Sequence, residues 1–580
     1  MGWKEIYKLW HDSKEMDASN VEALENMTEE EREDAFYKPL AFGTAGMRGV
    51  IAPGTNRMNE FTVKRATKGL ADYINSLGKE EAEKGVVISY DTRRMSSEFA
   101  CHAAKVLSAN GIKVYLFEAV RPVPLCSFAI IHLKCAAGIM ITASHNPKIY
   151  NGYKVYGNDG AQMSPEATEK VVEYISNTSY FGIKESETQL SASLIKDKDG
   201  YKADEYITII GKSLDDDYFK AIEKLSLSPE AVKEVGKTLK IVYTPIHGSG
   251  YMPVTTILKR MGIPFNVVEE QVLPDPDFST VKVPNPEEPD ALSLGITLAE
   301  KINSDIVIGT DPDSDRMGVA VRDESGKFVL LNGNQIGVLL ANYIMLRKKE
   351  EGVLPSNGAI VKTIVTTEMT RKVGDAYGAV TFDVLTGFKF IGEKITAWEK
   401  SGEYTYLFGF EESYGSLVGT HARDKDAVVA TMMFAEMACY YASKHSNVYK
   451  ELQKLYQTYG YYKEKTVSVS YGGIDGMNTM KRIMKEAGER HYSYVAEAKV
   501  LSVCNYTTGK ETFSNGEIKD LDLPKTSAIK LKLEYGDWVC IRPSGTEPKI
   551  KVYAASSADS YGKAEEKTEK YLAFMKEMLK

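Results

Sequence analysis

The sequence predicts an α/β protein with three tandem α/β domains, built on mixed sheets, and a C-terminal α+β domain. Helical and strand-like runs alternate from about residue 60, and the strands are continuous apolar runs, as in βαβ units around a buried sheet. Beyond the helix-like run 426–445 the pattern changes to strands of alternating polarity. A chain of 580 residues is also too long for one core, because single cores stop growing near about 250 to 300 residues.

The first domain is predicted over residues 1–212. Its acidic stretch 22–36 is interpreted as the solvated face of a helix. The apolar runs and their periods then predict helices over 63–78 and 96–111 and strands over 85–91, 113–118 and 136–144.

The second and third domains repeat this architecture without a strict repeat of residues. For the second domain, 213–327, we predict strands over 239–245, 264–270 and 304–311 and helices over 251–262 and 290–303. For the third domain, 328–445, strand and helix patterns follow one another in 327–346, 358–378 and 379–385 before the helix at 426–445.

The last domain, 446–580, is predicted to be α+β. Its alternating stretches predict strands over 466–471, 498–506, 528–535, 538–543 and 549–555, and the charged amphipathic run 564–580 predicts a final helix.

Composition narrows the class of protein. With 72 basic and 80 acidic residues the net charge is −8, so no basic field favours nucleic acid, and an anionic ligand would need local positive contacts. No apolar run reaches the length of a membrane span, and the N-terminus lacks the apolar core of a secretory signal. The six cysteines are scattered without a CxxC pair, which favours a reduced, cytoplasmic compartment. Nothing indicates an obligate protein partner.

A strand end carries alternating carboxylates in GTDPDSDRMGV, residues 309–319. Asp311, Asp313 and Asp315 would repel one another unless a cation lay among them, and hard oxygen ligands select magnesium or calcium. An EF-hand is excluded because Arg316 and Arg322 stand where its loop needs Gly and Glu. An acidic surface turn is the alternative.

Two further loops suit a phosphate group. ITASHNP, residues 141–147, places Ser144 directly after an apolar run, although Ser, Asn and Pro also shape ordinary turns. IRPSGTEPKIKVY, residues 541–553, offers a guanidinium, two hydroxyls and freed backbone amides in a turn between strands, and no Walker loop occurs in the chain.

Glycine-rich stretches complete the set. GFEESYGS, residues 409–416, presents carboxylates that could accept hydrogen bonds from sugar hydroxyls. Paired carboxylates are also typical of glycoside hydrolases, but glycoside hydrolysis would not require a phosphate-binding loop. FGTAGMRG, residues 42–49, does not match the dinucleotide-binding GxGxxG, but Arg48 on a flexible turn could reach a phosphate.

Taken together and in chain order, these stretches resemble the α-D-phosphohexomutase family, over roughly residues 40–555. TASHNP is similar to the family's phosphoserine loop, GTDPDSDR to its metal loop, GFEES to its sugar loop and RPSGTEP to its phosphate loop. The resemblance implies a heart-shaped enzyme of four domains that moves phosphate between the 1- and 6-positions of a hexose. It also implies Mg²⁺ as cofactor and a bisphosphate, glucose 1,6-bisphosphate, as intermediate and activator.

The resemblance also assigns roles to residues. Ser144 would carry the phosphate and contribute to the metal site, with His145 beside it. The metal would be held by Asp311, Asp313 and Asp315, and Lys389 is the leading candidate for proton handling. The remaining expected site residues are cations and groups that bind the sugar or its phosphate: Arg48, Lys154, Arg316, Lys362, Thr386, Gly387, Glu411, Ser413, Arg542, Ser544, Gly545 and Thr546.

The sugar is less sharply indicated than the reaction. GFEES is similar to the glucose-type motif and departs from the GEMSGH form of dual mannose/glucose enzymes, so a phosphoglucomutase is favoured over a phosphomannomutase. The length, TGFKFIG and HARDKDAV resemble a longer branch that also contains phosphopentomutases, acting on ribose or deoxyribose 1-phosphate, and glucose-1,6-bisphosphate synthases. Rivals from other classes are a magnesium-dependent aspartyl-phosphate phosphatase and a catalytically inactive sugar-phosphate sensor.

Overall fold

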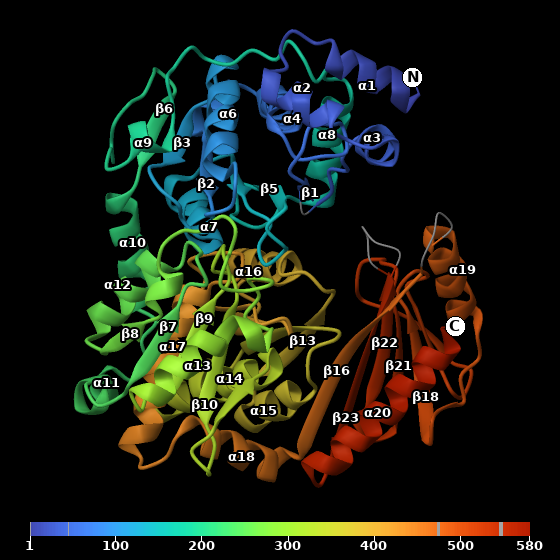
Figure 1. Ribbon diagram of the computed structural model, residues 1–580. Coiled ribbons are helices and arrows are strands. Elements are labelled where there is room, and N and C mark those ends of the chain that lie inside the picture. The colour runs from blue at the N-terminus through green and yellow to red at the C-terminus, as the bar shows by residue number, and fades with distance from the viewer. Residues whose placement is uncertain (1, 45, 472–475, 544–548, 580) are drawn as a thin grey trace. The chain divides into compact units, whose positions relative to one another are not determined.

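The computed structural model describes residues 2–44, 46–471, 476–543 and 549–579 (Figure 1). The chain forms two compact units: Met1–Pro355 with Phe388–Val448, and Ser356–Gly387 with Tyr449–Lys580. The predicted class is confirmed, since α/β domains with mixed sheets are followed by a sheet-rich C-terminal domain. The predicted limits of the four domains stay predictions.

Three short helices precede the first sheet: α1 (Trp3–His11), α2 (Ala18–Glu25) and α3 (Glu29–Phe36). The acidic stretch 22–36 was interpreted as the face of one helix, but it is divided between α2 and α3. The helix is interrupted there because Thr28 is the N-cap of α3 and begins a new helix. Their apolar sides pack in a cluster with Trp10, Phe36 and Phe61.

The first sheet has six strands in the order β1-β5-β4-β2-β3-β6. β2, β3, β4 and β6 run parallel, whereas β5 is antiparallel to both β4 and β1. The apolar strands are almost fully buried because helices cover them. The bounds are β1 (Met47–Val50), α4 (Glu60–Ser76), α5 (Lys79–Lys84), β2 (Val86–Tyr90), α6 (Ser96–Ala109), β3 (Val114–Phe117), α7 (Val123–Leu133), β4 (Ala137–Ile141), β5 (Tyr150–Tyr156), α8 (Pro165–Ser176), α9 (Ala192–Ile195) and β6 (Ile207–Ile210).

The second sheet is also mixed, with the order β11-β10-β9-β7-β8. β7, β8 and β9 are parallel, and β10 turns back antiparallel to β9. That reversal places the aspartate loop between β9 and β10. The elements are α10 (Lys212–Glu223), α11 (Pro229–Val235), β7 (Ile241–Thr244), α12 (Tyr251–Met261), β8 (Phe265–Val267), η1 (Glu269–Gln271), α13 (Pro289–Lys301), β9 (Ile306–Thr310), β10 (Met317–Arg322) and β11 (Phe328–Leu331).

The third predicted domain contributes to both compact units. The first unit contains α14 (Gly333–Glu350), α16 (Lys389–Ser401), β14 (Thr405–Phe410), β15 (Ser416–Val418) and the almost wholly buried α17 (Ala427–Ser443). The second unit contains β12 (Gly358–Thr363), α15 (Met369–Tyr377) and β13 (Val380–Val384), with β12 parallel to β13. α18 (Val448–Tyr459) follows.

The C-terminal sheet is antiparallel, in the order β16-β23-β22-β21-β18-β19-β20, with β17 beside β18. A core of its inward side chains packs with α19 and α20. The bounds are β16 (Tyr461–Ser470), α19 (Gly476–Glu489), β17 (Tyr494–Val495), β18 (Ala498–Asn505), β19 (Lys510–Phe513), β20 (Ile518–Asp520), β21 (Ile529–Leu533), η2 (Glu534–Gly536), β22 (Trp538–Pro543), β23 (Lys549–Ala558) and α20 (Tyr561–Met578). Among the described residues, we find no helix with both the length and the apolar character that crossing a bilayer requires.

Candidate active site

The serine loop, residues 142–150, begins where β4 ends. Ser144 is buried and has a left-handed backbone, with φ of 50°, which is uncommon for a residue with a side chain. Its N–H donates a hydrogen bond of 2.8 Å to Thr142 Oγ1. Its hydroxyl donates to Asp311 Oδ2 at 2.9 Å and lies 3.2 Å from His145 Nδ1. The predicted phosphate carrier therefore directly contacts the predicted metal loop.

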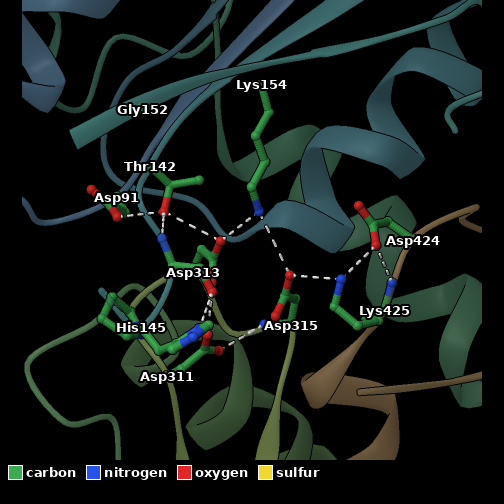
Figure 2. Close-up of polar contacts among 12 residues, drawn as sticks. Asp91, Thr142, His145, Gly152, Lys154, Asp311, Asp313, Asp315, Asp424 and Lys425 are labelled. Atoms are coloured by element: carbon green, nitrogen blue, oxygen red, sulfur yellow. Dashed lines mark hydrogen bonds and ion pairs between the residues drawn. The ribbon is translucent and has the colours of Figure 1, made fainter. Parts of the chain in front are cut away.

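The three predicted carboxylates converge on one point between β9 and β10 (Figure 2). Asp311, Asp313 and Asp315 are buried, and one oxygen from each lies within 4.8 Å of the other two. Burial and the neighbouring carboxylates raise the pKa of Asp311 well above its usual value. Oδ1 of Asp313 and Oδ1 of Asp315 are buried without a hydrogen-bond partner in the described part of the chain. This set of hard oxygen atoms fits a divalent cation such as Mg²⁺.

Lysines and an arginine surround the carboxylates. Lys154 Nζ, from β5, lies 2.9 Å from Asp313 Oδ2 and 3.7 Å from Asp315 Oδ2. Lys425 Nζ lies 3.1 Å from Asp315 Oδ2. Burial opposes ionisation of Asp315, but Lys425 and Lys154 outweigh it and hold the pKa of this carboxyl below its usual range. Arg316 pairs with Glu287 at 2.6 Å. The cluster is thus positively lined as well as acidic.

His145 lies next to Ser144, and Arg48 contacts the same loop. Burial, followed by the positive charges of Arg316 and Arg48, lowers the pKa of His145 well below its usual value, so its imidazole is neutral near pH 7. Arg48 lies on β1, opposite Gly152 of β5, and not on a flexible turn as the glycine-rich stretch suggested. Its guanidinium donates to Asn146 Oδ1 at 2.9 Å. The sheet therefore fixes this cation against the serine loop.

The sugar loop between β14 and β15 lies against the metal loop. Gly415 forms a β-bridge with Arg316, and the N–H of Met317 donates to the carbonyl of Tyr414 at 3.2 Å. Glu411 is buried and interacts electrostatically with Arg316. Ser413 is half-buried on the same loop.

Lys389 begins α16 and is half-buried. Its Nζ donates to Thr44 Oγ1 at 3.1 Å, in the stretch that leads to Arg48. Burial lowers the pKa of Lys389 against the opposing charge of Glu393. A lysine with a lowered pKa is more able to give up its proton, in keeping with the proton-handling role predicted from the sequence.

The other expected residues belong to the second unit. Lys362 of β12 is buried and pairs with Asp383 at 2.7 Å and Glu368 at 3.0 Å. Thr386 and Gly387 follow β13, and Arg542 lies at the end of β22. Ser544, Gly545 and Thr546 lie outside the described residues.

The sequence analysis did not identify residues that hold the serine loop and the aspartates through hydrogen bonds and ion pairs. Thr142 Oγ1 donates to Asp91 at 2.6 Å, and Arg93 donates to the carbonyls of Ser144 and Asn146. Lys425 also pairs with Asp424 at 3.0 Å. The stretches DTRR, after a buried strand, and HARDKDAV were visible signals. Only the folded chain shows that Lys425 pairs with Asp315 and that the Thr142 hydroxyl lies between Asp91 and Asp313.

The sequence is similar to known protein families. Three family models match in chain order: "Phosphoglucomutase/phosphomannomutase, alpha/beta/alpha domain I" over residues 39–181, domain II over 216–326 and domain III over 332–457. The chain is 37% identical over 542 residues to a phosphoglucomutase of Staphylococcus epidermidis, covering 92% of this chain and 94% of that protein. It is 36% identical over 534 residues to a phosphoglucomutase of Staphylococcus aureus, covering 92% of each.

Solved structures share the fold. A putative phosphomannomutase from Thermus thermophilus superposes with a TM-score of 0.66 at 22% identity, over 92% of this chain and 99% of that one. The open form of pp63/parafusin, a phosphoglucomutase from Paramecium, gives a TM-score of 0.67 at 18% identity, over 93% and 95%.

Proposed function

Since the chain belongs to the phosphoglucomutase/phosphomannomutase family of α-D-phosphohexomutases, we propose that it interconverts α-D-glucose 1-phosphate and glucose 6-phosphate through a phosphoserine at Ser144. The contact between the Ser144 hydroxyl and Asp311 carries this proposal, because it joins a possible phosphate carrier to a set of metal-binding carboxylates. The curated relatives that share 34–37% of the sequence are named phosphoglucomutases, which supports glucose as the sugar.

The residues of the first unit suit phosphoryl transfer, in which catalysis is mainly positioning and charge stabilisation. Ser144 would hold the phosphoryl group between turnovers, so a sugar hydroxyl would be the nucleophile of the first transfer and the serine hydroxyl that of the second. Bound beside Asp311, Asp313 and Asp315, Mg²⁺ would supply positive charge to the phosphate oxygens. Lys154 and Arg316 would add charge from the protein itself.

The two transfers need a proton acceptor and then a proton donor at the sugar oxygen. Lys389 would serve there because burial lowers its pKa, and neutral His145 lies beside the serine hydroxyl. The first transfer makes glucose 1,6-bisphosphate, and the second returns a phosphoryl group to Ser144. Glu411 and Ser413 would bind sugar hydroxyls, together with Thr386 and Gly387. The unreacting phosphate would be bound by Arg542, Ser544, Gly545 and Thr546, and Lys362 would add positive charge to the site.

The proposal is tested by incubating the purified protein with glucose 1-phosphate, Mg²⁺ and a catalytic amount of glucose 1,6-bisphosphate, and following glucose 6-phosphate. We expect turnover by the natural protein and loss of at least about 10³-fold in Ser144→Ala. Release of inorganic phosphate instead would indicate a phosphatase. If Ser144→Ala isomerised at the natural rate, the phosphoserine mechanism would be wrong.

Parallel reactions with ribose, deoxyribose and mannose 1-phosphates compare the alternative sugars. A higher kcat/KM for a pentose would make the protein a phosphopentomutase, and for mannose a phosphomannomutase. Accumulation of glucose 1,6-bisphosphate from a phosphoryl donor would indicate a synthase. We also propose a cytoplasmic location, in keeping with six free and buried cysteines.

A further inference from the structure

One arginine side chain shapes the serine loop. Arg93 Nη1 donates to the carbonyls of Pro147 at 3.0 Å and Tyr150 at 3.1 Å, while its Nη2 donates to those of Ser144 and Asn146. Four carbonyls of one loop thus converge on a single guanidinium. Because a guanidinium donates in its own plane, the orientation of that plane decides where the loop lies.

A turn of the second α/β domain covers this guanidinium. Phe278 is 1% exposed, and its ring lies over Arg93 with the guanidinium carbon 5.0 Å from the ring centroid. An aromatic ring attracts a cation on its face and leaves the in-plane N–H groups free to donate. Phe278 therefore fixes the plane of Arg93 without competing for its hydrogen bonds.

Phe278 is itself held in an unusual conformation. Its φ is 48°, and a left-handed backbone at a bulky residue persists only where the surroundings impose it. Asp275 imposes it here, since its carboxylate accepts the N–H groups of Asp277 at 2.9 Å and Ser279 at 2.8 Å. The imidazole of His247 ties the ends of the turn, through Thr280 Oγ1 at 2.8 Å and the carbonyl of Leu273 at 3.0 Å.

Ion pairs at the surface join the same two segments. Asp277 contacts Arg94 at 2.6 and 2.7 Å and Lys148 at 3.5 Å. Arg94 neighbours Arg93 in the chain, and Lys148 belongs to the serine loop. The turn therefore reaches the loop by two independent routes, one buried and one exposed.

We propose that Phe278, on the second domain, is a positioning residue for phosphoryl transfer at Ser144 on the first domain. Its ring fixes Arg93, and Arg93 fixes the backbone that presents the Ser144 hydroxyl to Asp311. The inference rests on the proposed mutase function for its kinetic consequence but not for the contact itself.

The kinetic test compares Phe278→Leu with Phe278→Tyr. Leucine is apolar and has a Cβ, so the apolar character and the backbone demand are kept while the ring face is lost. We expect kcat to fall about 10- to 100-fold in Phe278→Leu, since small misplacements of reacting groups have effects of that size. KM for glucose 1-phosphate should change less than about threefold, because the sugar is bound elsewhere. Phe278→Tyr should recover most of kcat. Leu273→Ala, at a side chain that is 74% exposed beside the turn, is the matched control without effect.

Amide hydrogen exchange tests the effect of the contact between Phe278 and Arg93 on the serine loop without any substrate. Peptides covering residues 142–150 should exchange faster in Phe278→Leu than in Phe278→Tyr. Unchanged exchange and unchanged kcat in Phe278→Leu would overturn the inference. Faster exchange in a protein whose natural form converts no sugar phosphate would instead overturn the proposed function and leave the positioning contact intact.

A folding defect does not remove the test. If Phe278→Leu does not fold, Phe278→Met takes its place, because methionine is apolar and flexible enough to fill the space of the ring without offering an aromatic face. It should raise exchange in the same peptides above that of Phe278→Tyr. Exchange as slow as in Phe278→Tyr would contradict the proposal.

Discussion

At the scale of single residues, the site gathers charges that destabilise the metal-free protein. The pKa values of Asp311 and Asp315 are shifted in opposite directions. Burial and the neighbouring carboxylates raise the pKa of Asp311, whereas Lys425 and Lys154 lower the pKa of Asp315 although burial opposes this. A carboxyl with a raised pKa resists ionisation in the folded state. The conflict is relieved by a cation or by a proton.

This conflict predicts that Asp311→Asn stabilises the metal-free protein at neutral pH while abolishing activity. Between the ordinary carboxyl pKa of about 3.9 and the raised value, the folded state of the natural protein binds more protons than the unfolded state. Its stability therefore falls as pH rises through that window, whereas asparagine has no such dependence. Chemical denaturation in EDTA should show the difference in unfolding free energy growing from about pH 4 upward.

The same variant should lose at least about 10³-fold in kcat, because the contact with Ser144 and one metal ligand are both removed. A variant less stable than the natural protein at pH 7 in EDTA would contradict the sign of the expected effect. Asp323→Asn, at an exposed carboxylate whose pKa is lowered by hydrogen bonds from residues of its own turn, is the control.

At the scale of elements, close backbone approach fixes the serine loop. Gly152 of β5 lies between β1 and β4, and a Cβ there would come within 2.5 Å of the Thr142 carbonyl oxygen and 2.9 Å of that of Met47. Both neighbours are backbone atoms and cannot rotate away. Thr142 accepts the N–H of Ser144, so a shift of Thr142 moves the serine.

We therefore predict that Gly152→Ala destabilises the protein by about 1 to 3 kcal/mol, as overpacking does. Its kcat per folded molecule should fall about tenfold, because the serine loop is displaced. The control is Gly157→Ala, where the nearest atom to an added Cβ would be at 3.4 Å, an ordinary contact. Equal kinetics for both variants would show that the strand spacing does not position Ser144.

The helices and strands were largely predictable from the sequence, whereas the contacts between them were not. Continuous apolar runs such as 85–91 and 136–144 predicted β2 and β4, because parallel strands that are buried on both faces consist of consecutive apolar residues. Arg48 was assigned to a turn because glycines preceded it, yet pairing with β5 made it a strand residue. DTRR marked Arg93 as a polar residue after a buried strand, but nothing local indicated its contact with Phe278, since that contact joins segments 185 positions apart, the difference between 278 and 93.

The site followed the same division. The three aspartates stand within five residues, so their spacing alone predicted a shared cation, and the structure confirms that their oxygens converge. Lys425 approaches them from 110 positions away, the difference between 425 and 315, and its role depends on a fold that the spacing cannot encode. Local chemistry is readable from sequence, whereas long-range support is not.

At the scale of the whole molecule, the chain crosses between its two compact units more than once. The first unit is interrupted by residues 356–387, which belong with the C-terminal sheet. Ser144 and the three aspartates all belong to the first unit, while Lys362 and Arg542 belong to the second. A single unfolding free energy need not describe such a chain.

Mg²⁺ is therefore expected to stabilise the first unit selectively. A ligand that binds only the folded state adds about 2.7 kcal/mol at a concentration 100 times its Kd. Amide exchange of the full chain, with Mg²⁺ or with EDTA, should show slower exchange in peptides of β4, β9 and β10 and no change in β21, β22 and β23. Asp313→Asn removes a carboxylate of which one buried oxygen has no hydrogen-bond partner among the described residues, and in this variant Mg²⁺ should have little effect on either unit. Equal protection of both units in the natural protein would mean that they unfold together, and protection confined to the C-terminal sheet would place the cation elsewhere.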